Sequence, residues 1–306
     1  MQILVIGATG VAGSSTVPVL VEAGHHVSGH ARTEEKASVL RRMGAEPVMG
    51  DAEDTDTLLG WLRGKDAVVD LRVQIPSPNR SVFPSSWREY VHLRDSAAGM
   101  VVDCAIRSDV PLAVHDTITM MYADGGERTI DEGWPVDAPG PLAANLAAER
   151  HLARLTEVGG RGVALRFGQF YGPVDVMSHE VLRRARRGQG LVLGDPAAWS
   201  SALHTDDIGP AVLAALGLPA GVYNVVDEQP LRRSEVLEVL AAAVGRPSLR
   251  QPPSILTKLG SAPMRALARS QRVSAERFRE ASGWRPRVPS RRVGWPAAAE
   301  QVRART

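Results

Sequence analysis

Three glycines at intervals of three residues, placed directly after a short apolar segment, constrain this chain more than any other feature. Residues 2–6 read Gln-Ile-Leu-Val-Ile, which predicts a buried β-strand, and residues 14–23 predict a helix. Gly7-x-x-Gly10-x-x-Gly13 stands between them. This layout presents backbone N–H groups and a helix N-terminus to a dinucleotide pyrophosphate. The stretch therefore predicts a dinucleotide site, with an ordinary strand-to-helix turn as the alternative.

The end of the second expected strand, residues 27–31, indicates which dinucleotide is bound. In such folds an acidic residue here hydrogen-bonds the ribose 2′-hydroxyl of NAD, whereas an arginine pairs with the 2′-phosphate of NADP. Arg32 occupies the position, with His30 beside it and no aspartate nearby. We therefore expect NADP(H). The alternative is a solvated loop arginine.

Strands and helices alternate along the first half of the chain, with further strands expected at 45–49, 66–72, 110–115 and 162–167. Residues 88–107 predict one long helix, and residues 142–157 predict another. Regular alternation is typical of an α/β fold built on a doubly wound parallel sheet (Rossmann), with the ligand at the carboxyl edge of the strands.

Composition limits the binding partners and the cellular compartment that we expect for this chain. The 306 residues carry a net charge of +2, so no basic field calls for a nucleic acid or a membrane. Cys104 is the only cysteine, which excludes an internal disulfide and suits a reducing compartment. With no apolar run of about 18 residues and no signal peptide before the first strand, we expect a cytoplasmic protein, either a monomer or a homodimer.

Six motifs in order resemble the extended short-chain dehydrogenase/reductase family, the relatives of nucleotide-sugar epimerases and dehydratases. They are the glycine turn, Gly50-Asp51, Leu165-Arg166 followed by Tyr171-Gly172-Pro173, His204-Thr-Asp206-Asp207, Val222-Tyr-Asn224-Val and Gly283-Trp284-Arg-Pro286. The resemblance spans essentially the whole chain. It implies an NADP-binding Rossmann domain over residues 1–167 and a smaller C-terminal α/β substrate lobe over 168–306. The strand at 222–227 is expected to rejoin the first domain.

The resemblance fails at the positions that transfer protons. The family uses a Tyr-x-x-x-Lys pair and a serine or threonine after the fifth strand. Alignment on Glu149 puts Pro141 at the tyrosine and Asn145 at the lysine, and alignment on Tyr122 puts Ile118 at the serine. No tyrosine in the chain has a lysine four residues on. None of the three residues can exchange a proton at neutral pH.

The resemblance, together with the expected ends of the strands, indicates which residues form the catalytic and cofactor-binding site. Thr117 and Asn145 are the catalytic candidates, Thr117 nearest the substrate oxygen and Asn145 holding the nicotinamide ribose. Their alternatives are a strand-end cap and a polar helix residue. The cofactor is assigned to Gly7, Thr9, Gly10, Val11, Ala12, Gly13, Arg32, Asp51, Ala52, Leu71, Arg72, Thr117, Asn145, Phe167, Gly168 and Gln169. No metal site is expected.

Hydride transfer needs only a positioned nicotinamide, because the cofactor carries the chemistry. The sequence therefore predicts an NADPH-dependent ketoreductase that acts on a bulky aromatic, polyketide-like ketone. The proton then comes from the substrate or from water, as in the atypical simocyclinone-type reductases of antibiotic biosynthesis that the degenerate triad resembles. Tyr122 is the one substitute acid considered. The alternatives are an inert NADP(H)-binding sensor or scaffold and an epimerase- or dehydratase-like enzyme.

The C-terminal lobe offers apolar side chains for such a substrate. A cleft floor could be built from Trp134, Met177, Trp199, Leu256, Met264 and Leu267, although core packing explains them as well. His204 and Asp207 are interpreted as structural residues at the hinge of the lobe.

Overall fold

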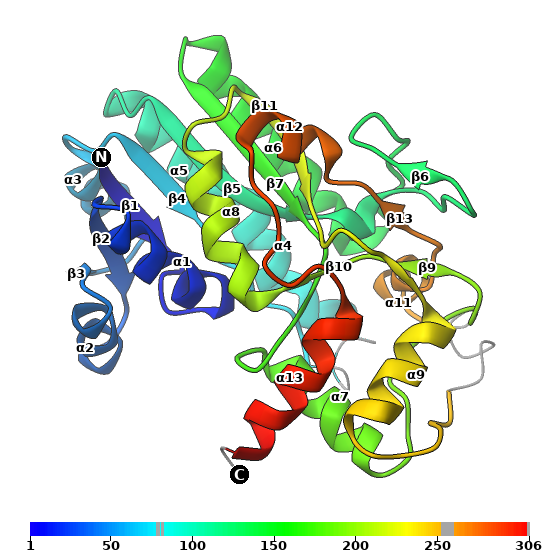
Figure 1. Cartoon of the computed structure of the whole chain (residues 1–306). Coiled ribbons are helices and arrows are strands. Elements are labelled where there is room, and N and C mark those ends of the chain that lie inside the picture. Colours follow the sequence, from blue (N-terminus) through cyan, green and yellow to red (C-terminus); the bar gives the residue numbers. More distant parts are fainter. Residues whose placement is uncertain (78–79, 81–82, 252–259, 305–306) are drawn as a thin grey trace.

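Seven parallel strands form the central sheet of the computed structural model, which describes residues 1–77, 80, 83–251 and 260–304 (Figure 1). From edge to edge the order is β3 (Glu46–Met49), β2 (His26–Ala31), β1 (Gln2–Ile6), β4 (Ala67–Asp70), β5 (Leu112–Ile118), β7 (Arg161–Phe167) and β11 (Gly221–Val225). The strand succession reverses between β1 and β4. Ligands of open parallel sheets bind beyond the carboxyl ends of the strands at this point. The doubly wound fold predicted from the sequence is confirmed.

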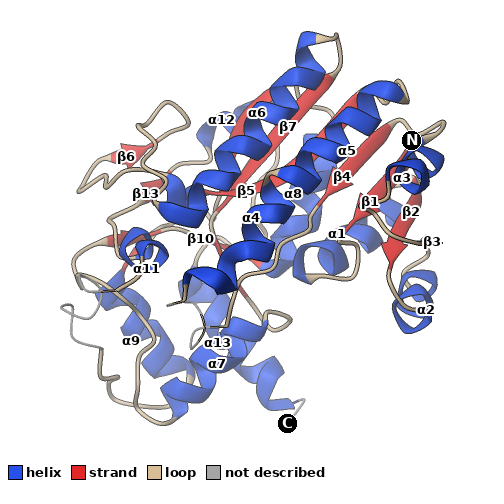
Figure 2. Ribbon diagram, turned by 180° about the vertical axis from the view of Figure 1, so that it is seen from behind, coloured by secondary structure: helices blue, strands red, loops and turns tan. Residues whose placement is uncertain are grey.

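Different helices cover the two faces of the sheet (Figure 2). One face packs against α1 (Val11–Glu22), α2 (Glu34–Arg42), α8 (Ile208–Ala215) and α12 (Glu276–Ser282). The other packs against α3 (Thr55–Leu62), α5 (Ser96–Arg107) and α6 (Ala144–Glu157). Val5 belongs to the first core and Ile6 to the second, because successive strand residues point to opposite faces. Burial on both faces explains why the strands are almost continuously apolar.

The second half of the chain adds a smaller lobe at the carboxyl edge of the sheet, in green, yellow and red in Figure 1. Its elements are β8 (Gln169–Tyr171), α7 (Val176–Arg186), β9 (Trp199–Ser200), β10 (Ala202–His204), β12 (Leu231–Arg232), α9 (Arg233–Ala243), α11 (Ala262–Leu267), β13 (Arg272–Val273) and α13 (Arg291–Ala304). A core of its own joins α7, α9 and α13 through Leu182, Val236 and Trp295. Strand β11 leaves this part of the chain and pairs with β7 in the main sheet.

Short elements complete the connections. They are η1 (Pro84–Trp87), η2 (Thr119–Met121), η3 (Gly140–Ala143), η4 (Thr205–Asp207) and β6 (Thr129–Ile130), which pairs with β13. At the hinge, the buried Asp207 carboxylate accepts the N–H groups of Arg287 at 2.6 Å and Val288 at 3.1 Å. His204 packs edge-on against Tyr171. Both contacts agree with the structural role expected for His204 and Asp207.

One expected helix is split in two, and two expected boundaries are off by three residues. Residues 88–107 form two helices, α4 (Arg88–Arg94) and α5, because Asp95 leaves the helical conformation at φ −111° and ψ −83°. The break lets Arg94 enter the core, where it pairs with Asp116. Strand β5 continues to Ile118, and helix α1 begins at Val11, after an extended Gly10.

Within the described ranges, no helix combines the length and apolar content that crossing a bilayer requires. The same residues contain no group of three or more metal-ligating side chains that could hold an ion.

Candidate cofactor and substrate site

The glycine turn is sterically required where β1 meets β4. Gly7 adopts φ +79°, and a Cβ atom there would lie 2.7 Å from the carbonyl carbon of Leu71. Gly13 lies in the first turn of α1, where a Cβ would come within 2.2 Å of the Gly7 carbonyl oxygen. Any side chain at either position would force backbone atoms apart. The turn is therefore tight, and it holds the N-terminus of α1 at the carboxyl edge of the sheet.

That helix end is built to receive an anion. Gly10 precedes the helix in an extended conformation, is exposed, and makes no side-chain cap. The first turn contains no acidic residue. The first N–H groups of a helix, here those of Val11 and Ala12, have no acceptor within the helix and carry the positive end of its dipole. Together with the half-buried Thr9, they fit a dinucleotide pyrophosphate.

The adenosine end of the crevice lies beyond β2 and β3. Arg32 follows β2 immediately, is exposed, and makes no ion pair within the part of the chain that the structure describes. His30 Nε2 donates to the Gly50 carbonyl at 3.1 Å, and the His30 ring lies 5.1 Å from the Trp61 ring. Burial lowers the pKa of His30. Arg32 is thus the charged group at this strand end that is free to meet a 2′-phosphate.

The Asp51 side chain is turned toward its own loop. Its Oδ1 accepts the N–H of Glu53 at 2.9 Å, so this carboxylate stabilises the turn over residues 51–53. Ala52, between them, is buried. The sequence assigned Asp51 and Ala52 to the cofactor, and the structure places both at the carboxyl end of β3, beside His30.

Arg72 folds back onto Asp70 at the end of β4. Its Nε and Nη2 donate to the two carboxylate oxygens of Asp70 at 2.9 Å and 2.7 Å. Burial alone would raise the pKa of Asp70, but the charge and hydrogen bonds of Arg72 outweigh it and lower that pKa. The Arg72 guanidinium is therefore held in place with its charge already compensated by Asp70.

The three positions of the proton-transfer triad lie on three different elements. Ile118 ends β5, Pro141 lies in η3, and Asn145 lies in the first turn of α6. Asn145 is fully buried, and its Nδ2 donates to the Tyr90 hydroxyl at 2.7 Å and to the Leu142 carbonyl at 2.9 Å. Its Oδ1 is buried without a partner. The amide is held in place, but it offers no titratable proton.

Tyr90 is the residue that sequence reasoning missed. It comes from α4, 55 residues before Asn145, and packs with Trp87, Leu142 and the half-buried Ile118 in one apolar cluster. Burial raises the pKa of the Tyr90 phenol, with Arg94 opposing the rise. A raised pKa makes this phenol a weaker acid than free tyrosine. No spacing rule would have linked residues 90 and 145.

Tyr122, the substitute acid considered from the sequence, is locked into the fold. It is completely buried, donates its hydroxyl proton to Asn224 Oδ1 at 2.8 Å, and accepts from Arg166 Nη1 at 2.7 Å. Burial raises the pKa of Tyr122 to about 12, although Arg166 opposes the rise. Its proton is committed to an internal acceptor.

Thr117 belongs to the same buried network. Its hydroxyl donates to Glu149 Oε1 at 3.3 Å, while Glu149 accepts two hydrogen bonds of 2.7 Å from Arg166. The residue itself is fully buried. These contacts favour a structural role for Thr117 over a position at the substrate oxygen, although the role is a link between β5 and α6 rather than the expected strand-end cap.

The expected nicotinamide edge connects directly to the lobe. Phe167 is buried and packs against Phe170, and a Cβ at Gly168 would lie 2.8 Å from the Ala202 carbonyl carbon. Gln169 is exposed, and its Oε1 accepts from Arg291 Nη2 at 2.7 Å. Position 169 thus joins the carboxyl edge of the sheet to α13.

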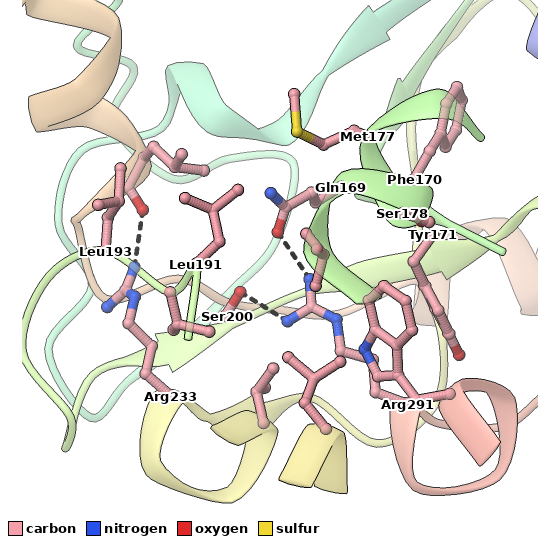
Figure 3. Close-up of a pocket in the computed structure, with 16 residues that line it drawn as sticks. Gln169, Phe170, Tyr171, Met177, Ser178, Leu191, Leu193, Ser200, Arg233 and Arg291 are labelled. Carbon is pink, nitrogen blue, oxygen red and sulfur yellow. Dashed lines mark hydrogen bonds between the residues drawn. The ribbon is translucent and has the colours of Figure 1, made fainter. Parts of the chain in front are cut away.

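A cavity opens next to this edge, between β8, α7, α9 and α13 (Figure 3). The space that a water-sized sphere can enter is about 60 Å³, and the wider hollow of about 560 Å³ includes open solvent. Its walls are mostly apolar, with Met177, Leu191, Leu193, Val236, Leu267 and Trp295 among them. Met177 and Leu267 were expected in a substrate cleft; Trp134, Trp199 and Met264 do not line this one, and Leu256 lies outside the described residues.

Comparison with protein families identifies the architecture. Residues 3–225 match the model of the NAD dependent epimerase/dehydratase family. The chain belongs to this family. A "3-diazoavenalumate denitrifying reductase" of a Streptomyces species is 30% identical over 304 residues, covering 96% of this chain and 99% of the relative. A "4-hydroxy-2-methyl-3-oxo-4-farnesyl-3,4-dihydroquinoline-1-oxide ketoreductase" of Stigmatella aurantiaca is 24% identical over 300 residues, covering 96% and 84%.

Solved structures agree on the fold of this family member. MoeE5 in complex with UDP-glucuronic acid and NAD superimposes with a TM-score of 0.80 at 23% identity, covering all of both chains. Human epimerase family protein SDR39U1 with NADPH gives a TM-score of 0.80 at 23% identity, covering 98% of this chain and 99% of that one. A nicotinamide dinucleotide therefore fits the fold, and reductases are among the relatives.

Proposed function

We propose that this protein is an NADPH-dependent ketoreductase that acts on a bulky aromatic ketone without a proton donor of its own. One observation carries the proposal: the triad positions hold Ile118, Pro141 and Asn145, and the nearby phenols of Tyr90 and Tyr122 are buried with raised pKa values. NADPH supplies the hydride when it is bound. The proton comes from the substrate or from water.

The chain's own residues then bind and orient the cofactor. The glycine turn and the N-terminus of α1 hold the pyrophosphate, with Asp51, Ala52, Leu71 and Arg72 along the crevice. Arg32 selects the 2′-phosphate. The Asn145 Nδ2 group is already bonded to Tyr90 and Leu142, so Asn145 would hold the nicotinamide ribose through its unpartnered Oδ1. Phe167, Gly168 and Gln169 line the nicotinamide. Without proton transfer from the protein, a factor of roughly 10²–10⁴ in rate is forgone or supplied by the substrate, for instance by a phenol already hydrogen-bonded to its ketone.

A second candidate reaction, the reductive removal of a diazo group, also fits a site that lacks a general acid. The Streptomyces relative is named as a denitrifying reductase of a diazo compound, and that match covers nearly all of both chains. An aryl diazonium that accepts a hydride becomes an arene and releases N2, so no proton is consumed. A site without a general acid suits this reaction as well as it suits a self-protonating ketone.

The test supplies purified protein with NADPH carrying deuterium at the transferred position, and with either 1-hydroxyanthraquinone or benzenediazonium. A ketoreductase oxidises NADPH with the quinone and places deuterium on the carbinol carbon. A denitrifying reductase releases N2 faster than an enzyme-free control and places deuterium on the ring. Tight NADPH binding with no oxidation by either acceptor would overturn the proposal in favour of an NADP(H) sensor. Conversion of UDP-glucose to UDP-galactose would favour the epimerase alternative.

A further inference from the structure

Two buried arginines share the cavity of the C-terminal lobe and face no carboxylate at ion-pair distance. Arg233 begins α9 and Arg291 begins α13, and they are 3% and 4% exposed. Both line the cavity (Figure 3). Among the described residues, neither guanidinium has an acidic group within 4.0 Å, whereas buried Arg94 and Arg166 are both paired. Burying a charge without a partner is costly, so this arrangement calls for an explanation.

The hydrogen bonds of these arginines are made to neutral groups and leave donors unused. Arg291 donates to Ser200 Oγ at 2.9 Å and to Gln169 Oε1 at 2.7 Å. Arg233 Nη2 donates to the carbonyls of Leu267 and Arg269, both at 2.7 Å. Arg291 Nε and Arg233 Nη1 are buried with no acceptor. Each arginine is thus held in a fixed pose with an N–H group to spare.

The charges themselves are unbalanced. Burial lowers the pKa of Arg233 to about 10; the charge of Arg291 adds to this effect, and the more distant Asp124 and Asp195 oppose it. Burial also lowers the pKa of Arg291, with Asp227 and Tyr171 opposing. Asp227 lies beyond ion-pair distance from Arg291, and burial raises the pKa of that carboxyl well above its usual range. The two guanidiniums repel one another, and an anion entering the cavity would relieve the repulsion.

We propose that Arg233 and Arg291 bind a carboxylate of the substrate, so that the substrate of this enzyme is an aromatic carboxylic acid. Arg291 Nε and Arg233 Nη1 are the donors left for a carboxylate, and a hydrogen bond between a guanidinium and a carboxylate is charge-assisted. Apolar side chains, including Leu240 and the ring of Trp295, suit a ring system. The Tyr171 hydroxyl and the Trp295 Nε1–H, both without a partner among the described residues, are further donors in the lining. Arg291 contacts Gln169, so an acid bound there extends its other end toward the nicotinamide edge. The inference rests on the proposed function, since it names the substrate class of that reductase.

The binding test uses the NADPH-loaded protein with 2-naphthoate and methyl 2-naphthoate, measured by calorimetry. We expect the acid to bind roughly 10- to 100-fold more tightly than the ester, because the ester removes a hydrogen bond to a charged group. The Arg291→Met and Arg233→Met variants should each remove most of this preference. Arg161→Met is the matched control, since Arg161 also clamps two backbone carbonyls, those of Leu216 and Leu218, but lies away from the cavity.

Equal binding of acid and ester by the unaltered protein would overturn the inference, and that comparison needs no variant to fold. Displacement of 2-naphthoate by UDP-glucose, lost in both arginine variants, would also overturn it in favour of a diphosphate. Turnover is measured separately with 6-acetyl-2-naphthoate and its methyl ester. Arginine-dependent binding of the acid without turnover would leave the carboxylate site standing and sink the reductase proposal. Turnover of the acid and the ester with equal KM would support the reductase proposal and overturn the carboxylate site.

Discussion

The two sides of the crevice are built by different means. Between β1 and β4 the backbone makes the site: Gly7 and Gly13 pack against main-chain atoms, and the helix N-terminus faces outward. Between β5 and β7 side chains make it, through buried networks around Asp116, Tyr122 and Asn145. A backbone site tolerates no substitution of its glycines. A side-chain site can keep its shape when its proton-transfer groups are replaced, and we propose that this is the case here.

The largest effect is expected on the side-chain half. Asp116→Asn leaves Arg94 buried without a charge partner and should cost about 3–5 kcal/mol of unfolding free energy, measured by urea denaturation. Asp103→Asn, which removes an exposed ion pair with Arg154, should cost no more than about 1 kcal/mol. Similar losses in the two variants would contradict the view that this half depends on buried pairs.

The same pair predicts a pH dependence. Burial alone would raise the pKa of Asp116, but Arg94 holds it at about 2, below its ordinary value of 3.8. A depressed pKa in the folded state contributes stability above the unfolded pKa, and this is lost as pH falls toward the folded one. Unfolding free energy should therefore drop by about 2 kcal/mol between pH 4 and pH 2 through this group. In Asp116→Asn this part of the slope should be missing.

On the backbone half, Gly13→Ala should destabilise the protein by about 3 kcal/mol, because its Cβ meets the Gly7 carbonyl at 2.2 Å. NADPH affinity should fall with it, as measured by fluorescence titration. The matched control is Gly60→Ala in helix α3, where a Cβ meets nothing within 4 Å. That change should stabilise the helix by up to about 1 kcal/mol. Equal changes in stability in Gly13→Ala and Gly60→Ala would contradict the claim that a side chain at position 13 clashes with the backbone.

Arg32→Ala sharpens the choice of dinucleotide. The loss of one charged contact should weaken NADPH binding by roughly 10- to 100-fold and leave NADH binding unchanged. Arg41→Ala serves as the control, because Arg41 is exposed but paired with Glu34 on α2. If NADPH and NADH weaken together, Arg32 acts on the fold of the loop rather than on the 2′-phosphate.

The backbone half could be predicted from the sequence because its signals are local. A strand, three glycines and a helix lie within 23 residues, and Arg32 follows the next strand directly. The side-chain half depends on contacts between distant residues: Asn145 with Tyr90, Arg94 with Asp116, and Gln169 with Arg291. Periodicity does not reveal such pairs. Asp95, which interrupts the expected long helix and turns Arg94 inward, carries no breaker signal such as proline or glycine.

The smallest effect tests the central claim, that neither Tyr90 nor Tyr122 donates the proton. Tyr90→Phe and Tyr122→Phe are assayed at saturating NADPH, with Tyr223→Phe in β11 as the control for loss of a buried hydroxyl contact. The account predicts that kcat of both variants stays within about threefold of the unaltered enzyme, with an unchanged pH profile. A loss of kcat in the range of about 10²–10⁴-fold in Tyr90→Phe or Tyr122→Phe, with NADPH affinity intact, would identify that phenol as the acid and contradict the account.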